Sequence, residues 1–65
     1  MNLKKHLNSC GVNPHDIYQT PDGKWTIKFH VTDDDGMRAF AQTGLQVVGW
    51  FRLDNLVCYR VANWR

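Results

Sequence analysis

The chain has 65 residues, of which 43% are hydrophobic and 12% aromatic, a composition that excludes intrinsic disorder and predicts a single compact domain over residues 1–65. Eight Lys and Arg face six Asp and no Glu, and the resulting formal net charge of +2 excludes a polybasic nucleic-acid-binding tail. No apolar run approaches the roughly 20 residues of a membrane span, and no apolar stretch follows the charged N-terminus as in a signal peptide. We therefore expect a cytoplasmic protein that does not bind a membrane.

A short helix is predicted over residues 2–10. Leu3, Leu7 and Cys10 recur there at helical spacing and so share one face. Gly11 follows directly and is a natural helix stop, because glycine readily adopts the left-handed conformation at a helix end.

A β-hairpin is predicted next, with strands over residues 16–20 and 24–31. The letters PDG between two β-rich runs suit a type I turn closed by a glycine in the left-handed region. This three-residue loop sets the register of the two strands. The side chains that then face the core are Ile17, Trp25, Ile27, Phe29 and Val31.

A second helix is predicted after the stretch TDDD at residues 32–35. This stretch supplies a capping side chain and negative charge for the positive end of the helix dipole. Met37, Phe40 and Ala41 form the apolar face of the predicted helix, and Gly44 ends it.

A second hairpin is predicted from residue 46 onward, with a two-residue turn at Asp54 and Asn55. The complete order of elements is then αββαββ. It predicts an α+β fold in which a four-stranded antiparallel sheet carries two short helices on one face. The other face of the sheet is left open.

Both faces of the second hairpin are unusually apolar, so the alternation along its strands does not identify the core side. The two-residue loop predicts the opposite pairs Leu53 and Leu56, Phe51 and Cys58, and Trp50 and Tyr59. We assign the side with Phe51 to the core, although Arg60 interrupts it, and the side with Trp50 to the open face. The open face then carries a candidate partner-binding surface made of Trp50, Tyr59, Arg52, Tyr18, Lys24 and Lys28.

Trp50 and Tyr59 are the predicted anchors of this surface, and Arg52 supplies directional hydrogen bonds, because Trp, Tyr and Arg dominate the energetics of protein interfaces. The rim of the surface consists of Tyr18, Lys24 and Lys28. An alternative is that the aromatic residues only stabilise the sheet as a cross-strand cluster.

The sequence predicts neither catalytic residues nor a metal site or cofactor. Glu is absent, and the Asp residues occupy turns or a helix start, where capping and turn formation explain them. Cys10 and Cys58 lack an activating sequence context; we expect free thiols, with a disulfide as the alternative for an exported protein. His6, His15 and His30 lack the spacing of a metal site. We therefore expect a protein that is not an enzyme.

Nucleic-acid binding is the alternative function, in one of two forms. In the first, single-stranded DNA or RNA stacks on the aromatic residues of the open face while basic side chains contact phosphates. In the second, residues 3–20 form a helix-turn-helix, with Gly11 at the turn and Pro14 in the first turn of the recognition helix. This second form competes with the hairpin for residues 16–20, and we favour the hairpin.

The leading hypothesis is a small non-enzymatic binding module that regulates or inhibits a larger protein partner. It would act through the aromatic-basic sheet face or through an exposed strand edge. A regulator or inhibitor of phage or mobile-element type fits this size. A homodimer that hides Trp50 is a third use of the same face.

Overall fold

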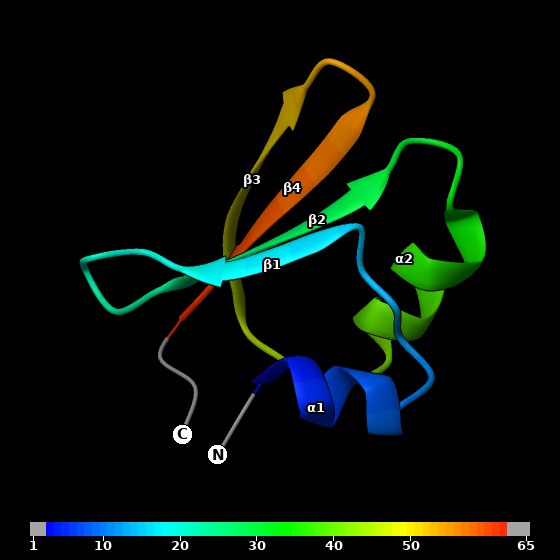
Figure 1. The fold of residues 1–65 in the computed structure, drawn as a ribbon, viewed down its shortest axis with the longest axis horizontal. Helices are drawn as coiled ribbons and strands as arrows, with labels where there is room; N and C mark the ends of the chain where they lie inside the picture. Colours follow the sequence, from blue (N-terminus) through cyan, green and yellow to red (C-terminus); the bar gives the residue numbers. More distant parts are fainter. Residues whose placement is uncertain (1–2, 63–65) are drawn as a thin grey trace.

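The computed structural model describes residues 3–62, which form two helices and one antiparallel sheet (Figure 1). In chain order the elements are α1 (Leu3–Ser9), β1 (Asp16–Gln19), β2 (Trp25–His30), α2 (Asp34–Ala41), β3 (Val47–Leu53) and β4 (Leu56–Val61). The strands lie in the order β1-β2-β4-β3, so β1 and β3 form the two edges of the sheet. This arrangement confirms the predicted α+β fold and its element order αββαββ.

The ends of both helices follow the predicted local signals. Gly11 and Gly44, which lie past the ends of α1 and α2, have φ angles of 82° and 79°. α2 begins at an aspartate cap, because the Asp33 carboxylate accepts a hydrogen bond from the backbone N–H of Gly36 at 3.0 Å. Ala41, which the sequence assigned to the apolar face of this helix, is exposed instead. Within residues 3–62, no helix has the length and apolar character needed to cross a membrane.

Both hairpins form in the predicted registers. The opposite pairs of the first hairpin include Ile17 and Ile27, and Tyr18 and Thr26. The opposite pairs of the second include Leu53 and Leu56, Phe51 and Cys58, and Trp50 and Tyr59. Its turn requires a left-handed residue, and Asp54 takes that conformation with a φ of 54°, which Asp tolerates better than most residues. Local turn chemistry therefore determines the pairing within each hairpin.

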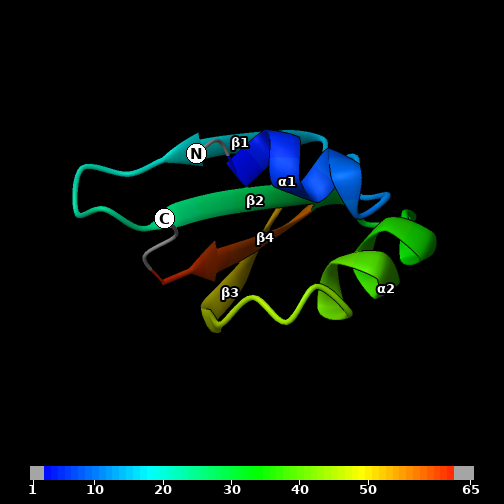
Figure 2. The same cartoon turned by 90° about the horizontal axis from the view of Figure 1, so that it is seen from below.

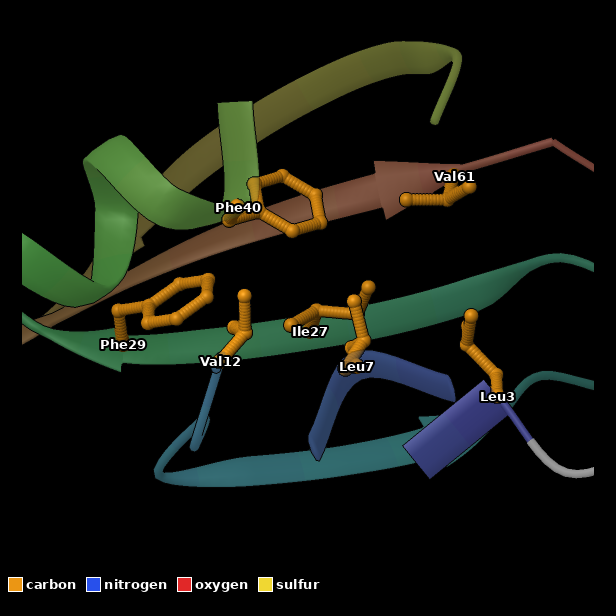
Figure 3. Close-up of a cluster of buried hydrophobic side chains, with 7 residues drawn as sticks. All are labelled: Leu3, Leu7, Val12, Ile27, Phe29, Phe40 and Val61. Carbon is orange, nitrogen blue, oxygen red and sulfur yellow. The ribbon is translucent and has the colours of Figure 1, made fainter. Parts of the chain in front are cut away.

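One cluster of buried side chains holds the helices against the sheet (Figure 3). Its members are Leu3, Leu7, Val12, Ile27, Phe29, Phe40 and Val61. Burial of a side chain of this kind contributes about 1.5–3 kcal/mol, so the cluster dominates the stability of a protein this small. Both helices contribute to it and therefore cover the same face of the sheet, with α1 along β1 and β2 and α2 next to the end of β2 (Figure 2).

The register between β2 and β4 decides which side of the second hairpin is buried. Ile27 lies opposite Tyr59, so Tyr59 is on the helix-covered face. The centroid of the Tyr59 ring is 6.0 Å from that of Phe29 and 5.1 Å from that of Phe40. The sequence-based assignment of Tyr59 to the open face is therefore wrong, and the second hairpin is turned over relative to that assignment.

The position of one charge explains this orientation. Arg60 is adjacent to Tyr59 in β4, so the two side chains point to opposite faces. If Phe51 and Cys58 faced the helices, the guanidinium of Arg60 would point toward the core, and an unpaired buried charge is costly. In the observed orientation Arg60 instead forms an ion pair with Asp22 at 3.1 Å.

We expect Tyr59→Ala to lower the free energy of unfolding by about 2–4 kcal/mol, since it removes a ring packed against the core. Tyr59→Phe is the matched control. It removes only the hydroxyl, which donates to the Met37 sulfur at 3.7 Å, and should cost less than about 1 kcal/mol. Urea unfolding followed by circular dichroism measures both values. A Tyr59→Ala protein as stable as the wild type would contradict the core position of this residue.

Candidate functional site

The exposed large hydrophobic side chains gather on one strand. Six such side chains are exposed among the residues that the structure describes, and five of them belong to β3. These five are Val47, Val48, Trp50, Phe51 and Leu53. Trp50 is the most exposed, at 66%. Contiguous exposed apolar groups commonly mark an interaction site, so β3 is the candidate functional site.

In the described part of the chain, β3 has a neighbouring strand on one side only, so it also carries backbone groups that no other strand pairs with. Successive residues of β4 direct their backbone groups alternately toward β2 and toward β3. Asn55 is directed toward β2, because its carbonyl accepts a hydrogen bond from the backbone N–H of Val31 at 2.7 Å, and every second residue after it is directed the same way. The residues of β4 between these form hydrogen bonds with β3, and Phe51 is one of their partners, so its backbone groups point toward β4. Trp50 and Arg52 therefore direct their backbone N–H and C=O groups away from the sheet. We call this free side of Val47–Leu53 the β3 edge.

The side chains of the β3 edge differ between its two faces. Trp50 and Arg52 lie on the helix-covered side of the sheet, whereas Phe51 and Leu53 lie on the open side. Arg52 is the single charged residue of β3, and its Nε donates to the carbonyl of Asp54 at 3.1 Å. Within residues 3–62 it forms no ion pair. The edge thus combines apolar groups on both faces with one cation.

The opposite edge of the sheet is less suited to pairing with another strand. β1 has four residues, and the polar side chains of Asp16 and Gln19 are exposed at its ends. Short length and charged side chains are two ways in which edge strands avoid unwanted pairing. β3 has seven residues, and its protection against pairing is limited to Arg52 and a bulge between Val47 and Gly49.

The residues that the sequence singled out do not form one surface. Trp50 and Arg52 lie on the helix-covered side, beyond the packed core, and Tyr59 is half-buried in contact with that core. Tyr18 and Lys28 lie on the open side, where the Lys28 Nζ is 5.2 Å from the centroid of the Tyr18 ring. The single aromatic-basic face is therefore not formed. The role of each of these residues in binding stays a prediction.

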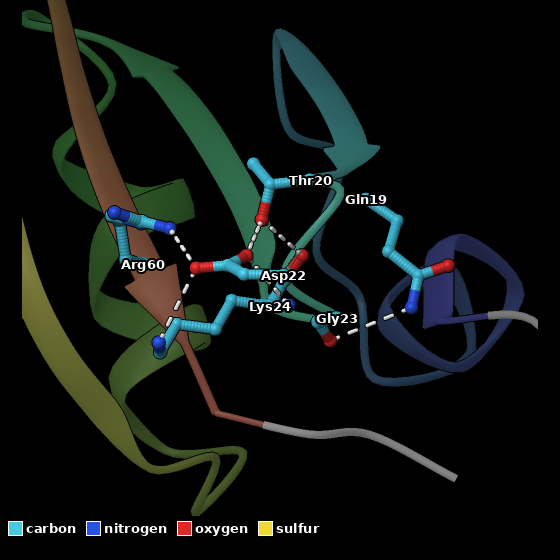
Figure 4. Close-up of polar contacts among 6 residues, drawn as sticks. All are labelled: Gln19, Thr20, Asp22, Gly23, Lys24 and Arg60. Atoms are coloured by element: carbon cyan, nitrogen blue, oxygen red, sulfur yellow. Dashed lines mark hydrogen bonds and ion pairs between the residues drawn. The ribbon is translucent and has the colours of Figure 1, made fainter.

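Lys24, the sixth of these residues, belongs to a polar cluster around Asp22 (Figure 4). The Asp22 carboxylate accepts a hydrogen bond from the Thr20 hydroxyl and lies 3.3 Å from the Lys24 Nζ and 3.1 Å from an Arg60 guanidinium nitrogen. The Thr20 hydroxyl, followed by the backbone N–H and the ammonium of Lys24, holds the pKa of Asp22 well below its usual range. Because Arg60 belongs to β4, the cluster ties the first turn to the second hairpin.

The open face is largely covered by its own side chains. Thr26 and Cys58 lie at its centre and are 2% and 0% exposed, although no helix covers this side. Tyr18 lies opposite Thr26, and Lys28 lies opposite Cys58. Long side chains beside short ones shield the short ones from water. This face therefore offers less unpartnered apolar surface than the β3 edge.

The sequence reasoning missed most of the β3 edge. It assigned Phe51 and Leu53 to the core and did not single out Val47 or Val48. The run VVGWFRL is almost continuously apolar, which is typical of a central strand buried on both faces. β3 is an edge strand because β4 pairs with β2 on its other side, and no local sequence pattern predicts that pairing.

The His and Cys side chains are further candidates for chemistry among the described residues. In the described part of the chain, no three His, Cys, Asp or Glu side chains are grouped so as to hold a metal ion. Cys10 is exposed and Cys58 is buried, and both are free thiols. The Cys10 Sγ lies 3.9 Å from the His6 Nε2 on the surface of the protein. That the protein is not an enzyme stays a prediction.

Comparison of the chain with known protein families, with curated proteins and with solved structures found no significant match. Neither a fold relative nor a sequence relative therefore suggests an activity or a partner. The geometry of the β3 edge is the feature of the molecule that points to a function.

We expect Asp22→Asn to destabilise the protein at neutral pH and to have a smaller effect in acid. The pKa of Asp22 is lowered in the folded state, so its contribution is fully present above the unfolded-state pKa of about 3.9 and is lost as the pH falls below that value. Urea unfolding of both proteins between neutral pH and about pH 2 measures the difference. A difference in stability that is independent of pH would show that the charge of Asp22 does not stabilise the fold.

Proposed function

We propose that this chain is a non-enzymatic binding module that regulates or inhibits a larger protein partner. In this proposal the β3 edge pairs with an extended segment of the partner. The observation that carries the proposal is that, within residues 3–62, five of the six exposed large hydrophobic side chains lie on β3 and no strand pairs with its outer side. Addition of a strand would supply hydrogen-bond partners for the free backbone groups and cover these side chains.

In the proposed complex, backbone groups of β3 hold the partner strand and side chains of β3 select it. The outward N–H and C=O groups of Trp50 and Arg52 would supply the hydrogen bonds that hold the added strand. Trp50 and Phe51 would act as anchors on opposite sides of the sheet, because large aromatic side chains dominate interface energetics. Arg52 favours an acidic residue opposite it. The predicted partner segment therefore carries one acidic residue opposite Arg52, flanked by apolar residues.

We also propose that the protein works in the cytoplasm. Cys10 is an exposed free thiol and Cys58 a buried one. Free thiols persist in reducing compartments, whereas oxidising compartments favour disulfides.

Nucleic-acid binding has weaker support. β1 occupies Asp16–Gln19, where a helix-turn-helix over residues 3–20 requires its second helix, so that form does not fit. For binding on the sheet face, Lys24 and Arg60 both pair with Asp22, which reduces the positive charge offered to phosphates. We therefore retain nucleic-acid binding only as an outcome to be tested.

Selection from a library of random peptides on the immobilised protein tests the proposal. We expect enrichment of extended apolar peptides that carry one acidic residue. Arg52→Pro should abolish their capture, because proline removes an outward N–H without breaking a hydrogen bond between β3 and β4. Gln19→Ala is the control, since it removes an exposed side chain from the opposite edge, and it should capture peptides normally.

Amide hydrogen exchange identifies where the selected peptides bind. At protein concentrations where the chain is monomeric, binding should protect the amides of Trp50 and Arg52, which face solvent in the monomer. Peptides that bind Arg52→Pro as tightly as the wild type, or that leave these two amides unprotected, would contradict the proposal.

Titration with single-stranded DNA, duplex DNA and RNA at low and moderate salt tests the alternative. We expect no saturable change in tryptophan fluorescence anisotropy. Saturable binding that weakens with salt and with Lys28→Ala would instead favour a nucleic-acid partner.

A further inference from the structure

We propose that a second copy of this chain occupies the β3 edge when no other partner does. The two β3 strands would pair antiparallel about a two-fold axis that passes beside Phe51. Four strands from each copy would then form one continuous sheet. The inference concerns the same edge as the proposed function, but it requires no other protein.

One register satisfies the backbone and charge constraints together. Hydrogen bonds form between residues whose backbone groups face each other, so the outward-directed Trp50 and Arg52 of one copy must lie opposite the same two residues of the other. Placing Arg52 opposite Arg52 would set like charges against each other. Placing Trp50 opposite Trp50 would bring Arg52 opposite Val48, where the bulge displaces the backbone. Placing Trp50 opposite Arg52 avoids both problems.

The side chains are self-complementary in this register. On the helix-covered side, the Trp50 ring of each copy would lie beside the Arg52 guanidinium of the other, in the arrangement of a cation–π contact. On the open side, the two Phe51 rings would meet as a non-hydrogen-bonded pair, in which opposite side chains are closest. Leu53 would lie opposite Gly49, which has no side chain to obstruct it. The guanidinium of Arg52, the single charge of β3, would thus contact an aromatic ring and not the Arg52 guanidinium of the other copy.

The same symmetry closes the assembly. A two-fold axis perpendicular to the sheet keeps the helices of both copies on one side and uses the same surface of each chain. The outer edges of the combined sheet would be the two β1 strands, each four residues long. Short edges resist further pairing, so the assembly stops at a dimer. Dimerisation would also hide the β3 edge, and a partner would have to compete with the second copy.

Sedimentation equilibrium of the full chain over a wide concentration range tests the pairing. We expect a reversible dimer in the wild type. Arg52→Pro should weaken dimerisation about tenfold or more, because symmetry removes an interfacial N–H from each copy. Gln19→Ala, at the opposite edge of the sheet, should leave it unchanged, and circular dichroism would check that each variant is folded. A wild type that stays monomeric at every concentration, or a dimer that a folded Arg52→Pro protein still forms with wild-type affinity, would overturn the proposal.

A pair of charge variants at position 50 tests the register. Trp50→Glu would place a carboxylate opposite Arg52 of the other copy, so the dimer should persist and weaken with added salt. Trp50→Lys removes the same ring but places a like charge there, so the dimer should dissociate. If both variants dissociate equally, the sign of the charge at position 50 does not affect the pairing and the proposed register is overturned. If neither does, β3 is not the interface.

The failure of this inference and the failure of the proposed function have different signatures. A monomeric wild type that still captures peptides through the β3 edge would overturn the dimer and leave the proposed function standing. A dimer with the predicted response to Trp50→Glu and Trp50→Lys that captures no peptide would support the dimer and contradict the proposed function.

Discussion

The pairing of β2 with β4, in which Ile27 lies opposite Tyr59, is the constraint on which the rest of the structure depends. This register places the Tyr59 ring against Phe29 and Phe40 and turns Arg60 to the face that no helix covers. A slip of one residue would exchange the two faces of the second hairpin and direct a guanidinium toward the core. A domain of this size has a net stability of only several kcal/mol, and an unpaired buried charge costs a comparable amount.

The same pairing creates the candidate site. Because β4 lies between β2 and β3, the most apolar strand of the sheet has one neighbour and forms an edge. The composition of β3 suits a strand covered on both faces, whereas its position leaves Trp50 and Phe51 in water on opposite sides. This disagreement between composition and position is the physical basis of the proposed function. A strand added beside β3 would turn the edge into the central strand that its composition suits.

The open face of the sheet shows how the rest of the surface avoids such a disagreement. Short residues at its centre, such as Cys58, are shielded by longer neighbours, and Lys28 lies over the Tyr18 ring. Asp22 gathers the hydroxyl, ammonium and guanidinium groups near the first turn into one hydrogen-bonded cluster. The charged groups of Asp22, Lys24 and Arg60 are thus paired within the chain. The unpartnered backbone and apolar side chains are concentrated at β3 instead.

The helices, the strands and the pairing within each hairpin follow from local sequence signals, because they depend on neighbouring residues: Gly11 after a helix, Asp33 as a cap, and short turns that bring adjacent strands together. The sequence also supported the fold class, since αββαββ has a simple packing with both helices on one face. Only the tertiary structure decided that Tyr59 faces the helices and that β3 is an edge. The physical reason is that these features follow from the contact between two hairpins far apart in the chain, where burial of aromatic rings and exclusion of the charge of Arg60 from the core act together.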